Sequence, residues 1–164
     1  MRAVDVGLAD ARQAVLALRD SGHAADSFGD LLERYVGDVE DRFGMTVSFD
    51  YAPELPQLAP RKQAEVLRIV QEALSNAARH ADAREVRVRV VGEGTDLVLS
   101  VIDDGRGFEP ASVEAGHVGL MTMRERAALI GADLAIDSGP GAGTRVVLTV
   151  PAEDAARRPW GEET

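Results

Sequence analysis

Two carboxylates and two glycines stand at the end of an apolar run in the middle of the chain. The stretch VIDDGRGFEP, residues 101–110, places Asp103 directly after apolar residues, with Gly105 and Gly107 close behind. A carboxylate accepts hydrogen bonds and cannot donate them, so Asp103 suits an amino group such as the N6 edge of adenine. Guanine presents a carbonyl there and would be disfavoured. The glycines allow another group to approach the backbone closely. An ordinary turn with solvated acids is the alternative, because this pattern alone is weak.

A second set of polar residues recurs every four positions in RKQAEVLRIVQEALSNAARHA, residues 61–81, namely Arg68, Glu72, Asn76 and His80. At 3.6 residues per turn each step advances about 40° around a helix. Asn76 and His80 then lie beside Ile69, at the shoulder of the arc expected to be buried. A solvated face explains the arginines well, but it explains Asn76 less well, since Asn is a poor helix former. The expected buried arc comprises Val66, Val70, Ala73, Leu74, Ala77 and Ala81.

Two glycine-containing segments could approach a phosphate. In EAGHVGLMTMRERA, residues 114–127, glycines precede a helical pattern that carries Arg124 and Arg126. The free N–H groups at a helix N-terminus suit anions, although a plain glycine entry with solvated arginines explains the segment about as well. The second segment, GPGAGT at residues 139–144, is a β-turn unless its surroundings give it another role.

Three familiar site patterns are excluded. An EF-hand beginning at Asp103 would have Glu114 at its last position, but Gly105 and Gly107 replace the required oxygen ligands. A dinucleotide fingerprint in GPGAGT fails because the strand-like TRVVLTV follows where a helix is needed. The P-loop pattern is absent, and Lys62 is the only lysine. A phosphate would therefore have to be held by arginine, backbone amides or a metal.

Composition narrows the class of protein. With 164 residues and 45% hydrophobic content, one domain with a substantial core is expected. The net charge of −10 argues against a nucleic-acid surface. There is no cysteine, hence no disulfide framework or thiolate metal site. No apolar run has the length of a membrane span, and no signal peptide is recognisable, so we expect a soluble, cytoplasmic chain.

The pattern of apolar residues predicts the elements that must position these groups. Helices are expected over residues 4–20, 27–43, 61–81 and 120–130, and strands over 45–51, 85–91, 96–102, 133–138 and 144–150. Ser27 is the expected N-cap of the second helix. Its expected buried side comprises Phe28, Leu31, Leu32, Tyr35, Val36, Val39 and Phe43. The order of elements indicates helices layered against one mixed sheet.

Taken together and in this order, QEALSNAARHA, DDGRGF, GLMTMRERA and GPGAGT resemble the N, G1, G2 and GT boxes of GHKL-type ATP-binding domains. The resemblance is to the catalytic domains of bacterial two-component sensor histidine kinases of the nitrate-sensor type, and it covers about residues 30–151. It implies an α/β two-layer sandwich, the Bergerat fold, with a mixed sheet of about five strands on about three helices. ATP and Mg²⁺ are the implied cofactors.

The resemblance also implies roles for individual residues. Asn76 would ligate Mg²⁺, Glu72 would orient or polarise the reacting centre, and His80 could contact phosphate. Asp103 would select adenine in a pocket opened by Gly105 and Gly107. Phosphates would lie at Gly119 and Leu120, with a short lid over roughly 108–118. The adenine side would be completed by Gly141, Gly143 and Thr144.

The chain departs from such kinases in having no recognisable phosphoacceptor. His23 falls in a helix break, His117 falls in the lid, and neither these nor His80 fits the acceptor pattern. We therefore expect a catalytic fragment that cannot autophosphorylate alone. Residues 1–22 would be a remnant of the second helix of the dimerisation and phosphoacceptor hairpin, residues 27–151 the ATP-binding domain, and residues 152–164 a polar, disordered tail.

The implied partners are a histidine on the missing hairpin and a response regulator that receives the phosphoryl group. The parent kinase would be a homodimer, whereas this fragment could be monomeric, and a membrane anchor on the parent is left open. Two alternatives share the boxes: a nucleotide-binding regulatory module without catalysis, and a serine kinase of the anti-sigma-factor type. The pair Glu72 and Asn76 argues against the first alternative, and GLMTMRERA against the second.

Overall fold

The computed structural model describes residues 27–109 and 118–152. This part of the chain forms five strands and three helices, α2 (Phe28–Phe43), α3 (Pro60–Arg79) and α4 (Val118–Leu129). The strands are β1 (Thr46–Tyr51), β2 (Glu85–Glu93), β3 (Asp96–Asp103), β4 (Asp133–Ser138) and β5 (Thr144–Pro151). The expected helix over residues 4–20, the tail from residue 153, His23, His117 and most of the expected lid lie outside the described residues.

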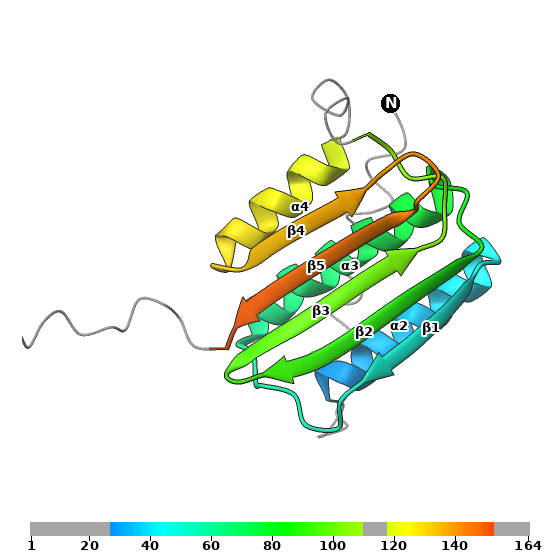
Figure 1. Ribbon diagram of the computed structural model, residues 1–164. Coiled ribbons are helices and arrows are strands. Elements are labelled where there is room, and N and C mark those ends of the chain that lie inside the picture. The colour runs from blue at the N-terminus through cyan, green and yellow to red at the C-terminus, as the bar shows by residue number, and fades with distance from the viewer. Residues whose placement is uncertain (1–26, 110–117, 153–164) are drawn as a thin grey trace, which may run out of the picture.

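The five strands form one mixed sheet in the order β1-β2-β3-β5-β4. β1 pairs with β2 in parallel, and the crossover between them is α3, whereas the other three pairings are antiparallel. All three helices lie on one face of this sheet (Figure 1). The predicted α/β two-layer sandwich is confirmed.

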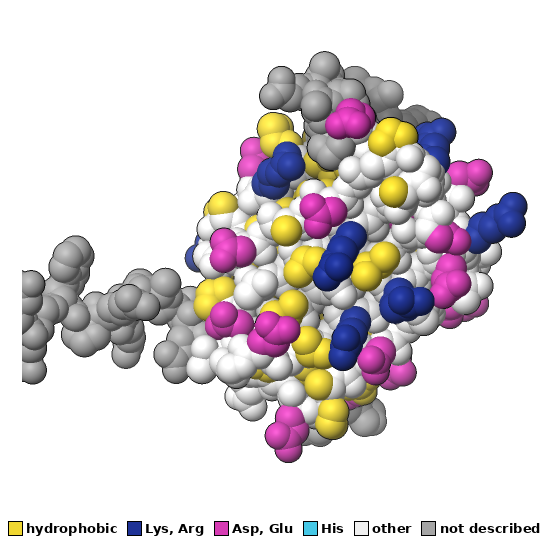
Figure 2. All heavy atoms as spheres, in the orientation of Figure 1, with side chains coloured by type: hydrophobic (Ala, Val, Ile, Leu, Met, Phe, Trp, Pro, Cys, Tyr) yellow, Lys and Arg dark blue, Asp and Glu magenta, His cyan; other side chains and the backbone are white. Residues whose placement is uncertain are grey.

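None of the helices within residues 27–109 and 118–152 lies on the opposite face of the sheet, whose alternating side chains include several arginines. Figure 2 looks onto this face and shows arginines among apolar side chains, with acidic groups around them. Arg87, Arg89 and Arg145 belong to this exposed set. Because successive side chains on a strand point to opposite faces, none of these guanidinium groups lies on the helical side.

Helix α2 begins where the sequence predicts, because Ser27 forms a capping box. The Asp30 N–H donates to Ser27 Oγ at 3.2 Å, and the Ser27 N–H donates to Asp30 Oδ2 at 2.8 Å. The burial prediction for this helix is partly wrong. The aliphatic residues are buried, but Phe28, Tyr35 and Phe43 are only partly buried, because these large rings lie at the margin of the core.

Helix α3 is the element that joins the core to the polar residues singled out above. It starts at Pro60, whose fixed φ suits the first helical position. Val66, Ile69, Val70 and Leu74 are fully buried against the sheet. Ile69 is thus part of the core itself, whereas Ala81, beyond the helix end, is only half-buried. The only lysine, Lys62, is buried and donates to the carbonyl of Pro151 at 2.7 Å.

No helix within the described ranges is long and apolar enough to cross a membrane.

Candidate functional site

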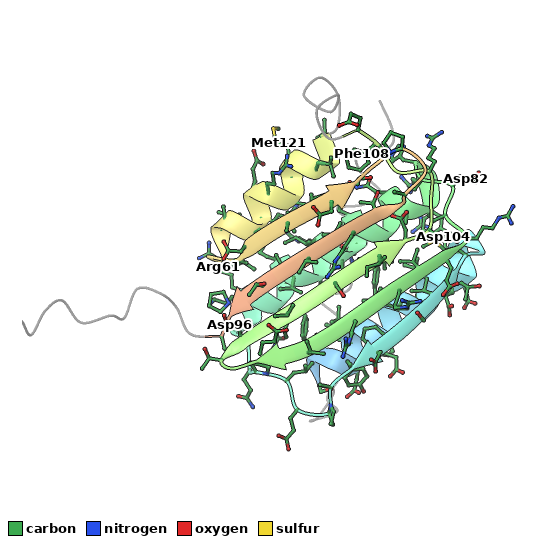
Figure 3. All side chains as sticks on the ribbon, viewed as in Figure 1. Arg61, Asp82, Asp96, Asp104, Phe108 and Met121 are labelled. Atoms are coloured by element: carbon green, nitrogen blue, oxygen red, sulfur yellow. The ribbon has the colours of Figure 1, made fainter. Side chains whose placement is uncertain are left out.

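A pocket of about 390 Å³ lies between α3, the start of α4 and one end of the central strands. This volume falls within the range of about 300–1,000 Å³ that small-molecule sites occupy. Figure 3 shows Phe108 and Asp104 at this end of the sheet and Asp96 at the other end of β3. The lining residues come from α3 and its end (Glu72, Ala73, Asn76, His80, Ala81), from β3 and the following loop (Val101, Asp103, Arg106, Gly107, Phe108), from α4 (Val118, Gly119, Leu120, Met123) and from β5 (Thr144, Val146).

Asp103 is the buried carboxylate of this pocket. It ends β3, it is only 9% exposed, and its Oδ1 accepts from the Gly105 N–H at 2.8 Å. Burial raises the pKa of the Asp103 carboxyl above its usual value, while hydrogen bonds from the backbone of Gly105 and Thr144 oppose that shift. A desolvated carboxylate gains most from an added donor, so a ligand amino group at this wall would be bound strongly.

The neighbouring carboxylate, Asp104, binds backbone N–H groups outside the pocket. Its Oδ1 accepts from the backbone N–H groups of Arg84 at 2.8 Å and Glu85 at 3.0 Å, so it ties β3 to the start of β2. These two hydrogen bonds lower the pKa of the Asp104 carboxyl. Asp104 is exposed and does not line the pocket. The two adjacent acids therefore differ, one facing the pocket and the other fixing the backbone.

Glycines shape the loops beside Asp103 by removing side-chain volume. Gly107 and Gly143 have φ values of 62° and 73°, which L side chains rarely adopt. A Cβ on Gly107 would overlap the carbonyl oxygen of Gly139, and a Cβ on Gly143 would overlap that of Asp103. Gly105 does not need a positive φ; a Cβ there would instead collide with Ala81. The loops after β3 and before β5 can therefore lie against each other only with glycine at these positions.

Helices α3 and α4 pack antiparallel, with contacts seven residues apart on each. At the pocket, Gly119 lies so close to Glu72 that a Cβ there would overlap the Glu72 carboxylate. Two turns away, Arg126 Nη1 donates to Glu65 Oε2 at 2.9 Å. Arg68 Nη1 lies 3.6 Å from the other oxygen of Glu65. The carboxylate of Glu65 thus interacts with two arginines, and through Arg126 it joins the last turn of α4 to α3.

Asn76 and Glu72 line the pocket from α3, one turn apart. The Asn76 amide lies near Gly119, since Nδ2 would be 3.5 Å from a Cβ built there. Within the described residues, no group of three or more His, Cys, Asp or Glu side chains could hold a metal ion. An amide and a carboxylate oxygen nevertheless fit Mg²⁺, which commonly takes one or two protein ligands and completes its shell with phosphates and water.

The structure brings most of the expected site residues around this one pocket. Glu72, Asn76, His80, Asp103, Gly107, Gly119, Leu120 and Thr144 all line it. Gly105, Gly141 and Gly143 do not line it. Gly105 instead donates to Asp103, and the Gly141 N–H donates to the carbonyl of Arg106.

Some lining residues were missed at the level of sequence. Val101 and Val146 form part of the apolar floor, and strand alternation could have identified them. Each lies two residues from a named pocket residue, Asp103 and Thr144 respectively, and so shares its face. Ser138, which is outside the pocket lining, was also missed: its Oγ accepts from the Phe108 N–H and donates to the Gly143 carbonyl. Only the fold brings Ser138 to these loops, so no local sequence signal indicates this role.

Comparison with known protein families identifies residues 61–154 with the model described as histidine kinase-, DNA gyrase B-, and HSP90-like ATPase. The chain is 30% identical over 150 residues to the signal transduction histidine-protein kinase/phosphatase DegS of Brevibacillus brevis. It is 36% identical over 119 residues to the nitrate/nitrite sensor protein NarX of Escherichia coli strain K12. These alignments cover 90% and 72% of this chain but only 38% and 20% of the two relatives.

Solved structures share the fold. The histidine kinase domain of the Erythrobacter litoralis blue-light activated histidine kinase matches with a TM-score of 0.72 and 24% identity, covering 87% of this chain and 72% of that one. The ATP binding domain of PrrB from Mycobacterium tuberculosis matches with a TM-score of 0.63 and 24% identity, covering 78% of this chain and 96% of that one. The resemblance inferred from the sequence boxes is confirmed by the family match.

Proposed function

Because the chain belongs to the histidine kinase-, DNA gyrase B-, and HSP90-like ATPase family, we propose that its pocket binds ATP with Mg²⁺ and donates the γ-phosphoryl group to a histidine on a helical hairpin. The hairpin would belong to the parent sensor kinase, and a response regulator would receive the phosphoryl group next. The relatives named as a histidine-protein kinase and a nitrate/nitrite sensor protein support this proposal.

The single observation that carries the proposal is the buried carboxylate of Asp103 at the end of a pocket large enough for a nucleotide. Its raised pKa is the mark of a desolvated acceptor. The adenine amino group is a donor of the right kind, and guanine offers a carbonyl at the same place. The apolar floor of the pocket, which includes Val101 and Val146, suits the flat face of a base.

The phosphate end of the nucleotide would lie at the start of α4. The first backbone N–H groups of a helix lack intrahelical partners, so those near Gly119 and Leu120 are free to donate to phosphate oxygens. Asn76 would hold the metal ion through its side-chain oxygen. Mg²⁺, when bound, would neutralise the developing charge on the phosphates. Glu72, held against Gly119, would orient the attacking imidazole rather than form a covalent bond with it.

The rest of the assembly follows from the same proposal. Residues 27–151 would be the ATP-binding domain and residues 1–22 part of the hairpin that carries dimerisation in the parent kinase. The parent would then be a homodimer. The chain spans 38% and 20% of the length of the two relatives.

Transfer to a hairpin supplied in trans tests this function. Incubated with ATP labelled in its γ-phosphate and a separately produced histidine-bearing hairpin, the chain should label the hairpin in an acid-labile, base-stable manner typical of phosphohistidine. The control is the same hairpin with its histidine replaced by glutamine, which should stay unlabelled.

Two other outcomes would overturn the histidine-kinase assignment. An acid-stable phosphoserine on a serine-bearing partner, with no labelling of the hairpin, would indicate a serine kinase. Tight nucleotide binding without transfer to any of several hairpins would indicate a regulatory module.

A further inference from the structure

The described part of the pocket is short of positive charge for a ligand that carries several phosphate groups. Its lining includes two carboxylates, Glu72 and Asp103, and one guanidinium, Arg106, besides His80. Metal coordination offsets part of the ligand charge, but phosphates in proteins are commonly also met by a cationic side chain. A cationic side chain that contacts the phosphates is therefore expected at this pocket.

Most of the cationic groups that could serve are absent or engaged elsewhere. The segment FEPASVEAGHV, residues 108–118, contains neither lysine nor arginine, so the expected lid provides no permanently charged cationic side chain. Lys62 is buried with its ammonium on the carbonyl of Pro151. Arg68 and Arg126 share the carboxylate of Glu65. Among the pocket residues that the structure describes, Arg106 is the one arginine or lysine.

The backbone of Arg106 is fixed, whereas its side chain is exposed. Its N–H donates to the carbonyl of Ala81 at 2.8 Å, and its carbonyl accepts from the Gly141 N–H at 2.6 Å. The residue is thereby pinned between the end of α3 and the loop before β5. Within residues 27–109 and 118–152, no carboxylate forms an ion pair with its guanidinium. A pocket residue with a fixed backbone and an exposed guanidinium that no described carboxylate pairs with is suited to capture an anion.

We propose that Arg106 binds a phosphate oxygen of the nucleotide and so contributes the positive charge that the lid lacks. This inference rests on the proposed function, since it names a further binding residue of the same site. The competing use of the same side chain is stacking on the adenine ring, because a guanidinium also packs on aromatic faces. The two uses differ in which part of the nucleotide they recognise.

Calorimetric titration of ADP and of adenosine separates these two uses. Arg106→Gln removes the charge and keeps a side chain of similar polarity. We expect ADP affinity to fall by about ten- to a hundredfold, which is what a hydrogen bond to a charged group is commonly worth. Adenosine affinity should stay within about twofold, because no phosphate is present for the guanidinium to bind. Arg106→Lys should recover part of the loss through its retained charge.

Arg145→Gln is the matched control. Arg145 follows the pocket residue Thr144 but lies on the face of the sheet opposite α2, α3 and α4, so its loss changes the net charge equally without touching the pocket. ADP affinity in this variant should match wild type. Thermal unfolding followed by circular dichroism would establish that each variant is folded.

Equal ADP affinity in folded Arg106→Gln and wild type would overturn the proposal, and so would an equal loss for ADP and adenosine. Neither result would affect the proposed function, because ADP would still bind to the wild-type chain. Failure of ADP to bind to the wild-type chain would instead remove the proposed function, and this inference with it.

Discussion

Asp103→Asn should weaken binding of a non-hydrolysable ATP analogue by about ten- to a hundredfold, because the lost interaction is a hydrogen bond to a charged, buried acceptor. The substitution keeps the shape of the side chain but replaces one acceptor oxygen by a donor. One oxygen already accepts from the Gly105 N–H at 2.8 Å, so in either orientation the new NH₂ group would face another donor. Isothermal calorimetry of both proteins measures the difference directly. The variant should also lose its preference for adenine over guanine.

Asp104→Asn is the control for this prediction. It removes the same charge one residue away, and its remaining amide oxygen can still accept from Arg84 and Glu85. Because Asp104 is exposed and outside the pocket lining, analogue affinity should stay within about twofold of wild type. If folded Asp103→Asn binds the analogue as tightly as wild type does, Asp103 does not read the base.

Asn76→Ala should abolish the effect of Mg²⁺ on nucleotide binding and reduce phosphoryl transfer on the order of a hundredfold, the loss typical of removing one preorganised polar group at a reacting centre. The substitution deletes the side-chain oxygen that would hold the metal ion. Its cost to folding should be small, since Ala is the best helix former and Asn76 accepts the N–H groups of His80 and Ala81 through its backbone carbonyl, which remains. Titrations with Mg²⁺ and with EDTA provide the comparison.

Ser75→Ala serves as the control for Asn76. Ser75 is the preceding residue of α3, is half-buried like Asn76, and does not line the pocket. Its loss should leave both the Mg²⁺ response and the transfer rate at wild-type values. A Mg²⁺ response in Asn76→Ala as large as that of wild type would refute the metal-binding role of this side chain.

Local patterns were sufficient to predict the elements because local physics determines them. The ends of α2 follow from Ser27 and Gly44. Every second residue is buried along β3 and along most of β2, with exposed or partly buried residues between them. The order of strands could not be read in this way. β5 lies between β3 and β4, and β1 pairs in parallel with β2, through contacts that are distant in sequence. For the same reason, sequence gave no way to tell that the aromatic rings of α2 would lie at the core margin.

The site was predictable where a residue type carries a chemical requirement. Asp103 and Gly107 were identified because a carboxylate after a strand suits a hydrogen-bond donor, and a glycine allows another group to approach the backbone closely. Arg106 lies between them and was missed, because a lone arginine in a loop has no periodicity or spacing to distinguish it. The proposal for Arg106 became possible only with the fold, which places Arg68 and Arg126 beside Glu65 and Arg106 at the pocket.

Calorimetric titration of the wild-type chain with non-hydrolysable analogues of ATP and GTP, each with and without Mg²⁺, tests the central claim most directly. The account predicts binding of the ATP analogue that responds to Mg²⁺, together with binding of the GTP analogue that is weaker by about tenfold or more, since a buried acceptor then faces a carbonyl. Equal binding of the two analogues, or no binding of either by the folded chain, would contradict the claim that this pocket is built for ATP.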